Sequence, residues 1–179
     1  MNKIATLLVI LTILQGCGPK NNTSAAMNNN QEQDKSIEND DTIPRVTGIG
    51  GIFFFSEDPQ KTKDWYSENL GLETNEWGSS FEFRNAHRPE EINYLQWSPF
   101  KHGSKYFEPS KKDFMINYRV QNIEGLVRNL KANGVTVLDE IESFDYGKFV
   151  HIMDSEGNKI ELWEPVDKVF TAMNLKTTK

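Results

Sequence analysis

The stretch Gly147–Pro165, GKFVHIMDSEGNKIELWEP, decides how the second half of the chain folds. Phe149, His151 and Met153 alternate with Val150 and Ile152, and Ile160 and Leu162 alternate with Glu161 and Trp163. Between these runs, Asp154–Asn158 supplies the acidic, amide and glycine residues that favour a tight turn. The pattern predicts a β-hairpin.

Strand alternation singles out one carboxylate within this hairpin. Successive side chains of a strand point to opposite faces, so Ile160 and Leu162 are expected to pack against a core, with Glu161 and Trp163 on the other face. A carboxylate between two apolar residues is a candidate for chemistry if that other face is a concavity. Glu161 is therefore the first candidate functional residue.

The N-terminus carries the pattern of an export signal. An apolar run, Ile4–Leu14, follows Lys3 and is too short to span a bilayer, as in a signal-peptide core. Leu14–Cys17 then resembles the lipobox of bacterial lipoproteins, which implies a signal peptide over residues 1–16, lipidation of Cys17 and anchoring to a membrane of the bacterial cell envelope. An ordinary secretory signal followed by an incidental cysteine is the alternative.

Composition excludes several classes of function. The chain has 179 residues, of which 37% are hydrophobic, and a formal charge of −6. Because no basic run accompanies this acidic balance, a nucleic-acid partner is not expected. A single cysteine also excludes an internal disulfide framework and a multi-cysteine zinc site.

The composition divides the chain into segments. After Cys17, residues up to 44 are rich in Asn, Gln, Ser and acidic residues and lack aromatic residues, which predicts a disordered tether over residues 17–44. Residues 45–166 are expected to form the globular domain, followed by a C-terminal tail over residues 167–179.

Two copies of one supersecondary unit are expected in that domain. The first has a helix between Asp58-Pro59 and Gly71, with Trp65, Tyr66 and Leu70 on one face. The second has a helix from Asn122 to Gly134. The strands are expected at Thr47–Ser56, Leu72–Trp77, Ser80–Arg84 and Ile92–Trp97, and at Phe114–Val120, Val135–Glu142 and the hairpin.

The near-constant spacing of these landmarks predicts an α+β fold in which two βαβββ repeats form a cup-shaped mixed sheet with helices on the outside. The two units are expected to enclose a cleft between their sheets. Two unrelated α+β halves are the alternative.

These residues resemble the vicinal oxygen chelate superfamily, which includes glyoxalase I, extradiol dioxygenases, methylmalonyl-CoA epimerase and bleomycin-resistance proteins. The similar pieces are Gly51–Phe54 with Asp58-Pro59, Trp65-Tyr66 with Leu70–Leu72, Tyr118–Val120, Gly134-Val135 and Asp154–Leu162. The resemblance covers nearly all of residues 46–165. It implies a fold more strongly than an activity, because this superfamily supports several reactions and pure ligand binding on one scaffold.

The resemblance also implies four positions for metal ligands, which fall on Gly51, Leu95, Met115 and Glu161. Only Glu161 suits the hard or borderline divalent ions of this superfamily. A one-residue shift in the fourth strand would bring in Gln96, which still leaves the ligand set short. The resemblance therefore implies no metal cofactor of the usual kind, although another divalent site is not excluded.

The expected site is an aromatic cup with few polar groups, typical of a small-molecule site. Glu161 and His151 are candidate catalytic residues. The expected ligand-binding residues share the inward side of alternating strands with Leu95 and Phe149; they are Phe53, Phe55, Trp97, Asn117, Arg119 and Trp163. In this arrangement Glu161 could bond to Arg119. The loop Pro99–Lys112 could be a lid over one end of the cup or an ordinary connection between the units.

Three functions are compatible with these residues. The first is a metal-independent small-molecule binding protein similar to the bleomycin-resistance branch and held at the envelope. The second is an enzyme of the lyase, isomerase or dioxygenase type in which Glu161 and His151 act as acid and base, with or without a metal bound in a non-standard way. The third is an envelope protein that only contacts other proteins. A homodimer is compatible with each.

Overall fold

The structure is a computed structural model of the chain and describes residues 41–86 and 88–179. The expected signal peptide, the lipidated Cys17 and most of the expected tether lie outside the described residues. The elements are β1 (Arg45–Ser56), α1 (Pro59–Leu70), β2 (Ser79–Arg84), β3 (Ile92–Lys101), the 3₁₀ helix η1 (Lys105–Phe107), β4 (Phe114–Gln121), α2 (Ile123–Ala132), β5 (Thr136–Val137), β6 (Glu142–Phe144), β7 (Gly147–Met153), β8 (Lys159–Pro165) and α3 (Asp167–Met173).

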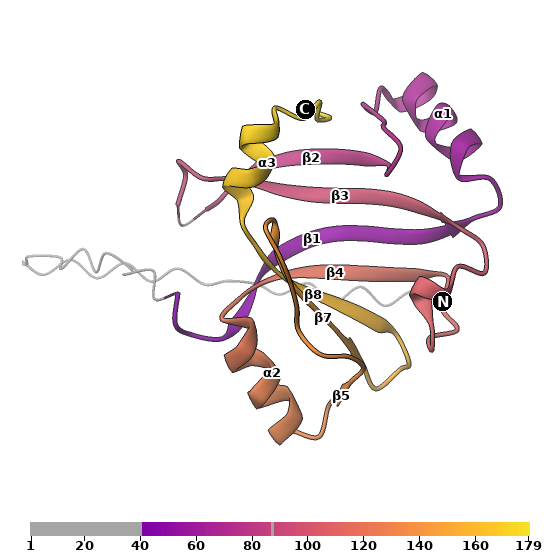
Figure 1. The fold of residues 1–179 in the computed structure, drawn as a ribbon. Helices are drawn as coiled ribbons and strands as arrows, with labels where there is room; N and C mark the ends of the chain where they lie inside the picture. The colour runs from indigo at the N-terminus through magenta and orange to yellow at the C-terminus, as the bar shows by residue number, and fades with distance from the viewer. Residues whose placement is uncertain (1–40, 87) are drawn as a thin grey trace, which may run out of the picture. The chain divides into compact units, whose positions relative to one another are not determined.

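The strands form one open, mixed sheet with the order β2-β3-β1-β4-β8-β7-β5, and β6 pairs with β7 (Figure 1). The first strands of the two halves, β1 and β4, pair antiparallel in the middle of this sheet. The expected α+β fold with a curved mixed sheet is confirmed. The expectation of a cleft between two sheets is wrong, because the β1–β4 pairing joins both halves into one continuous sheet.

Helix α1 begins and ends where the sequence predicted. The Asp58 side chain accepts a hydrogen bond from the Lys61 amide, and Gly71 ends the helix in the left-handed region at φ 71°. The predicted apolar face of α1 is only partly buried, since Trp65 and Leu70 are 54% and 58% exposed. Tyr66 faces the sheet, with its ring 4.6 Å from the Trp97 ring.

The predicted strand Leu72–Trp77 is wrong. Asn75 and Gly78 exchange backbone hydrogen bonds, so the chain turns before a strand can form, and only Thr74 pairs with Ser79. The end of the chain lies beside β2 instead, where Thr178 bridges Phe81. This segment blunts a sheet edge that would otherwise expose unpaired backbone groups.

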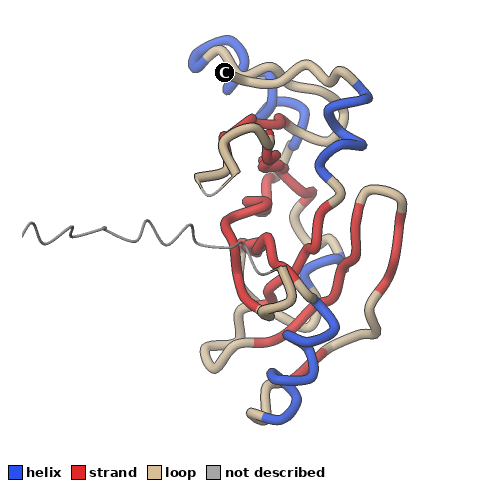
Figure 2. Tube along the Cα trace, turned by 90° about the vertical axis from the view of Figure 1, so that its left-hand side faces the viewer, coloured by secondary structure: helices blue, strands red, loops and turns tan. Residues whose placement is uncertain are grey.

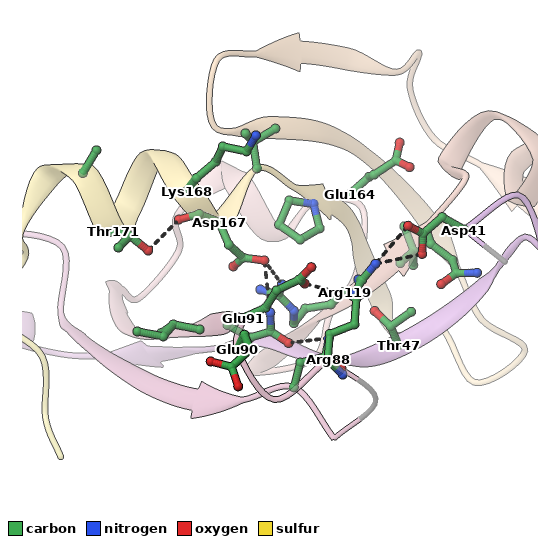
Figure 3. A pocket seen from close by; sticks show the side chains of 18 residues that line it. Asp41, Thr47, Arg88, Glu90, Glu91, Arg119, Glu164, Asp167, Lys168 and Thr171 are labelled. Carbon is green, nitrogen blue, oxygen red and sulfur yellow. Dashed lines mark hydrogen bonds and ion pairs between the residues drawn. The ribbon is translucent and has the colours of Figure 1, made fainter. Parts of the chain in front are cut away.

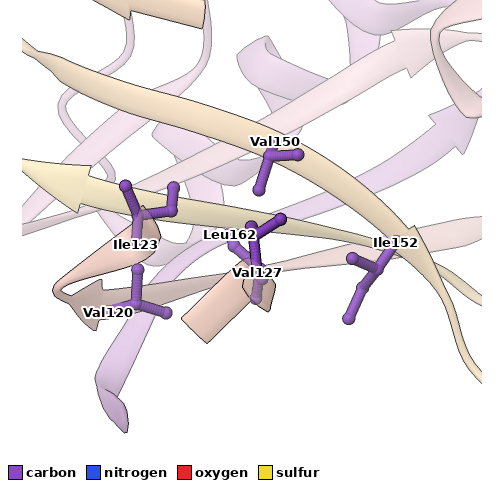
Figure 4. Close-up of a cluster of buried hydrophobic side chains, with 6 residues drawn as sticks. All are labelled: Val120, Ile123, Val127, Val150, Ile152 and Leu162. Atoms are coloured by element: carbon purple, nitrogen blue, oxygen red, sulfur yellow. The ribbon is translucent and has the colours of Figure 1, made fainter. Parts of the chain in front are cut away.

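The second half contains the larger core cluster of the described domain. Ile123 and Val127 of α2 pack on the sheet residues Val120, Val150, Ile152 and Leu162 (Figure 4). Leu162 is 3% exposed. The predicted position of Leu162 beneath the helix is therefore confirmed. The predicted strand Val135–Glu142 is shorter than expected, because only Thr136–Val137 pairs with β7 before the chain leaves the sheet.

The two faces of the sheet carry different elements. Helices α1 and α2 cover one face, as their contacts with Trp97 and Leu162 show. The opposite face, which we call the Glu161 face, is covered at one end by η1 and at the other by α3, whose Phe170 contacts Trp163. Figure 2 shows strands through the middle of the domain and helices around them. No helix in residues 41–86 and 88–179 is long and apolar enough to cross a membrane.

Candidate functional site

One row of side chains crosses the Glu161 face. Strand pairing aligns Gly51 with both Gln96 and Asn117, Asn117 with Glu161, and Glu161 with His151. Residues aligned across neighbouring strands point to the same face of a sheet. These five aligned positions bring together the amides of Gln96 and Asn117, with Gly51 between them, the carboxylate of Glu161 and the imidazole of His151.

Glu161 is the centre of this row and is 3% exposed. Its Oε1 accepts a hydrogen bond from the Tyr106 hydroxyl at 2.7 Å, and its Oε2 accepts one from Asn117 Nδ2 at 3.2 Å. The nearest basic group is His151, whose Nε2 lies 3.8 Å from Oε1. Tyr106 comes from η1, so the loop after β3 supplies a direct contact to the strand carboxylate.

His151 is held between two carboxylates. Its Nδ1 lies 2.6 Å from Asp139 Oδ2, and Asp139 also accepts the His151 backbone N–H at 2.7 Å. The Nε2 atom on the Glu161 side is buried and has no hydrogen-bond partner among the described residues, and neither has Oδ1 of Asn117. The 3.8 Å gap between His151 Nε2 and Glu161 Oε1 is too long for a hydrogen bond.

The electrostatics of this cluster favour a charged imidazole. Burial alone would lower the pKa of His151, but the facing carboxylates of Glu161 and Asp139 outweigh it and raise the pKa. Burial, followed by the Glu161 charge, raises the pKa of Tyr106, which keeps its hydroxyl a donor. Burial lowers the pKa of Lys159, whose Nζ binds the Tyr106 carbonyl.

Aromatic rings fill the η1 end of the Glu161 face. Phe107 is 1% exposed and its ring lies 4.2 Å from that of Phe55. Phe53 and Met115 complete this cluster, and Phe100 stacks on Tyr106 with ring centroids 5.3 Å apart. The segment proposed as a lid or a connection thus packs into the face and closes it over Glu161.

Arg119 lies toward the opposite end and does not contact Glu161. Its Nη2 pairs with Asp167 at the start of α3, and its Nη1 donates to the Tyr94 carbonyl at 3.0 Å. Its guanidinium carbon lies 5.1 Å from the centre of the Trp163 ring. The expected bond between Arg119 and Glu161 is wrong, because residues expected to form a tail provide the carboxylate that Arg119 binds.

A pocket of about 700 Å³ lies at this α3 end (Figure 3). It is lined by the ends of β4 and β8, the starts of β1 and β3, the segment before β3, and α3. Arg119 and Asp167 lie on its wall (Figure 3). Glu161 and His151 line neither this pocket nor the smaller one beside it in the described part of the chain.

The structure places the predicted site residues in three groups. Asn117, Glu161 and His151 form the polar cluster, and Arg119 lines the pocket. The predicted aromatic residues Phe53 and Phe55 pack with Phe107 of η1, and Trp163 stacks on Phe149.

Trp97 and Leu95 lie on the face opposite to the one predicted. Trp97 is aligned with Ile52 and contacts Tyr66 of α1, whereas Gln96 is aligned with Gly51. A shift of one residue in a strand exchanges its two faces. The one-residue shift considered from the sequence is therefore the observed register.

The implied metal-ligand positions do not fit a metal. A Cβ at Gly51 would lie 2.7 Å from the Phe53 ring, and Met115 is fully buried among aromatic rings. Gln96 already accepts from the Ser80 hydroxyl at 2.8 Å and donates to Ser98 at 3.1 Å. Within residues 41–86 and 88–179 no group of three His, Cys, Asp or Glu side chains is arranged to hold a metal ion.

Sequence reasoning missed three functional candidates: Asp139, Tyr106 and Asp167. Tyr106 lies in the loop considered as a lid, Asp139 lies in the predicted strand Val135–Glu142 beyond the end of β5, and Asp167 follows the last expected strand. Only the tertiary contacts bring them to His151, Glu161 and Arg119.

Comparison with known proteins gives a family match over most of the domain. The family model for the Glyoxalase/Bleomycin resistance protein/Dioxygenase superfamily matches residues 48–162. The uncharacterized protein YetH of Bacillus subtilis (strain 168) is 25% identical over 134 residues, which cover 66% of this chain and 99% of that protein.

Solved structures are similar in fold. A variant of Streptomyces coelicolor methylmalonyl-CoA epimerase, in complex with 2-nitronate-propionyl-CoA, has a TM-score of 0.51 at 16% identity and covers 68% of this chain and 99% of its own. Methylmalonyl-CoA epimerase from Mycobacterium tuberculosis has a TM-score of 0.46 at 21% identity, with coverage of 70% and 93%. At these identities the likeness concerns the fold alone.

Proposed function

The chain belongs to the Glyoxalase/Bleomycin resistance protein/Dioxygenase superfamily, and from this premise we propose that its domain binds a small organic molecule at the α3 end of the Glu161 face. The observation that carries the proposal is the pocket of about 700 Å³ beside Arg119 and Asp167. This volume is within the usual range for ligand sites, which combine apolar walls with a few fixed polar groups.

The polar wall of the pocket is rigidly built. Arg119 is 6% exposed, and Asp167, the Tyr94 carbonyl and the Trp163 ring hold its guanidinium from three directions. Groups that are already oriented lose little freedom when a ligand binds, which favours affinity. Of the aromatic residues expected to touch the ligand, only Trp163 contacts this wall, where its ring packs against the Arg119 guanidinium.

A pocket-blocking variant tests this proposal. Ala172 lines the pocket from the exposed side of α3, so Ala172→Phe should fill the space without changing the core. Two-dimensional NMR with a library of small amphipathic compounds should identify ligands of the wild-type domain that the variant no longer binds. Ala132→Phe, on exposed α2 surface outside the pocket, is the matched control. Ligands that bind Ala172→Phe and Ala132→Phe equally well would count against the proposal. A library in which no compound binds the wild-type domain would also count against it.

A second candidate function is acid–base catalysis without the superfamily's usual metal. It is favoured by the alignment of Asp139, His151 and Glu161, with Asp139 orienting the imidazole. Tyr106 would have to leave Glu161 before a substrate could reach it, because its hydroxyl occupies Oε1. Deuterium uptake from D₂O by a panel of 2-oxo acids and acyl thioesters would reveal such an enzyme, and uptake should disappear in Glu161→Gln. Uptake unchanged by that substitution would exclude Glu161 as the base.

We also propose that the domain acts at the bacterial cell envelope. The support is the lipobox-like Leu14–Cys17 after an apolar run, which lies outside the described residues. In cell fractionation, the wild-type protein should sediment with membranes, whereas Cys17→Ser should be released or remain unprocessed. A wild-type protein found wholly in the soluble fraction after export would contradict the anchor.

A further inference from the structure

The first residue of α3 places a carboxylate where the sheet supplies two donors. Asp167 pairs with Nη2 of Arg119 (Figure 3), and Oδ2 of Asp167 also accepts from Asn93 Nδ2 at 3.2 Å. Both donors are oriented by groups outside α3, since Arg119 Nη1 donates to the Tyr94 carbonyl and Asn93 Oδ1 accepts from Asn85 at 3.2 Å. Charged and neutral donors held in this way suit any carboxylate, whether it comes from the chain or from a ligand.

The fourth residue of α3 places an aromatic ring beside that carboxylate. The ring centroid of Phe170 lies 5.5 Å from that of Tyr94, 5.7 Å from that of Trp163 and 6.2 Å from that of Tyr146. These three rings belong to β3, to β8 and to the turn before β7, and they surround a ring that α3 contributes. Tilted and edge-to-face contacts of this kind favour aromatic rings in general, so a ligand ring could take the place of Phe170.

Helix α3 is held on the face mainly by these two residues. None of the seven residues Asp167–Met173 is buried, and no side chain in the described part of the chain caps the start of this helix. A helix of this length is not stable alone in water, so its contacts with the face maintain it. Apart from Asp167 and Phe170, Thr171 contributes one contact, between its hydroxyl and that of Tyr94 at 3.1 Å. A ligand carboxylate that replaced Asp167 would release α3 without leaving the buried Arg119 unpaired.

We propose that α3 is an internal competitor, and that the seat of Asp167 and Phe170 binds an arylalkanoate, a carboxylate joined to an aromatic ring by a short alkyl chain. This inference rests on the proposed function, since it names the ligand class and the regulation of the same site, whose pocket is lined by Asn93 and Arg119. Side chains three positions apart on a helix have Cβ atoms about 5 to 6 Å apart, a distance that an alkyl chain of about three carbons spans. Because the ligand binds only when α3 has left the seat, its apparent affinity falls in proportion to the open fraction.

Three probes with one skeleton and different head groups test the inference: 4-phenylbutanoate, 4-phenylbutylamine and 4-phenylbutanol. Calorimetric titration of the wild-type chain should show the acid binding more tightly than the amine and the alcohol, because only the acid can replace Asp167 at Arg119. Asp167→Asn removes the charge of the competitor and keeps its shape, so this variant should bind the acid at least about tenfold more tightly than wild type. Glu156→Gln, which removes an exposed carboxylate from the turn between β7 and β8, is the control and should bind as wild type does.

NMR of the wild-type chain covers the case in which Asp167→Asn fails to fold. Saturating 4-phenylbutanoate should abolish the proton contacts between the Phe170 and Trp163 rings and replace them with contacts between the probe and Trp163. The contact between Phe55 and Phe107, at the other end of the face, should persist as the internal control.

Two results would overturn the inference and leave the proposed function standing. One is an acid that binds while Phe170 stays on Trp163, or that binds Asp167→Asn no more tightly than wild type. The other is equal or tighter binding of the amine or the alcohol. Binding of none of the three probes would also overturn the inference, and the library screen against Ala172→Phe would then decide the proposed function separately.

Discussion

Leu162→Ala should destabilise the domain strongly, because Leu162 is at the centre of the cluster formed by α2 and the sheet. The side chain is 3% exposed and belongs to the same core cluster as Val120, Ile123, Val127, Val150 and Ile152. Truncation removes three carbon atoms and leaves a cavity that rigid strands on both sides cannot close. Such changes cost about 2 to 5 kcal/mol, and about 3 kcal/mol is expected here.

Urea and thermal unfolding followed by circular dichroism measure this loss. A loss of about 3 kcal/mol should lower the Tm by about 10 °C for a domain of this size. Leu70→Ala is the matched control, because it makes the same chemical change on α1 at a side chain that is 58% exposed. The control should remain within about 0.5 kcal/mol of wild type. A loss below about 1 kcal/mol for Leu162→Ala, or equal losses for both variants, would refute the register of β8 and with it the position of Glu161.

Three further predictions concern the Glu161 face. Because the pKa of folded His151 is raised, the stability that the charged imidazole contributes is fully present below its ordinary pKa near 6.5 and is lost as pH rises through the higher folded pKa. Urea unfolding across this range should show a steeper decline in stability for wild type than for His151→Gln. Parallel stability profiles of the two proteins would contradict the ion-pair geometry. Gly50→Ala should cost about 1 to 3 kcal/mol in urea unfolding, because a Cβ would lie 2.2 Å from Asn117 Oδ1 and 2.7 Å from the Trp163 ring. Gly48→Ala on the same strand, whose Cβ would lie 3.7 Å from its nearest neighbour, should cost less, and the reverse order would contradict this packing. Protein purified without chelators should carry well under one equivalent of Zn, Mn, Fe, Co or Ni by elemental analysis, and stoichiometric metal that disappears in Glu161→Ala would overturn this expectation.

The sequence alone determined most of the secondary structure. Asp58, Pro59 and Gly71 predicted the bounds of α1, and the β7–β8 hairpin followed from alternation around a tight turn, because capping, turn chemistry and period-two burial act within a few residues. The same alternation placed Leu162 in the core. The matching order of the two halves predicted the fold, since each unit leaves a sheet face that needs a partner.

The tertiary structure decided which face of the sheet each side chain occupies and which residues it contacts. The register of β3 could not be obtained from its own residues, because apolar residues occur at both parities and only pairing with β1 sets Gln96 beside Gly51 and turns Trp97 toward α1. The segment Leu72–Trp77 turns through the Asn75–Gly78 hydrogen bonds instead of forming the predicted strand, and Thr178 from the end of the chain bridges β2 at Phe81.

The candidate sites depend on contacts between residues that are far apart in the chain. Arg119 reaches Asp167 across 48 positions, and Tyr106 reaches Glu161 across 55. No local pattern specifies such pairs, because each results from how η1 and α3 fold back over the Glu161 face. The sequence could therefore identify the residues capable of chemistry, whereas the fold decided that Glu161 faces His151 and that the open pocket belongs to Arg119 and Asp167.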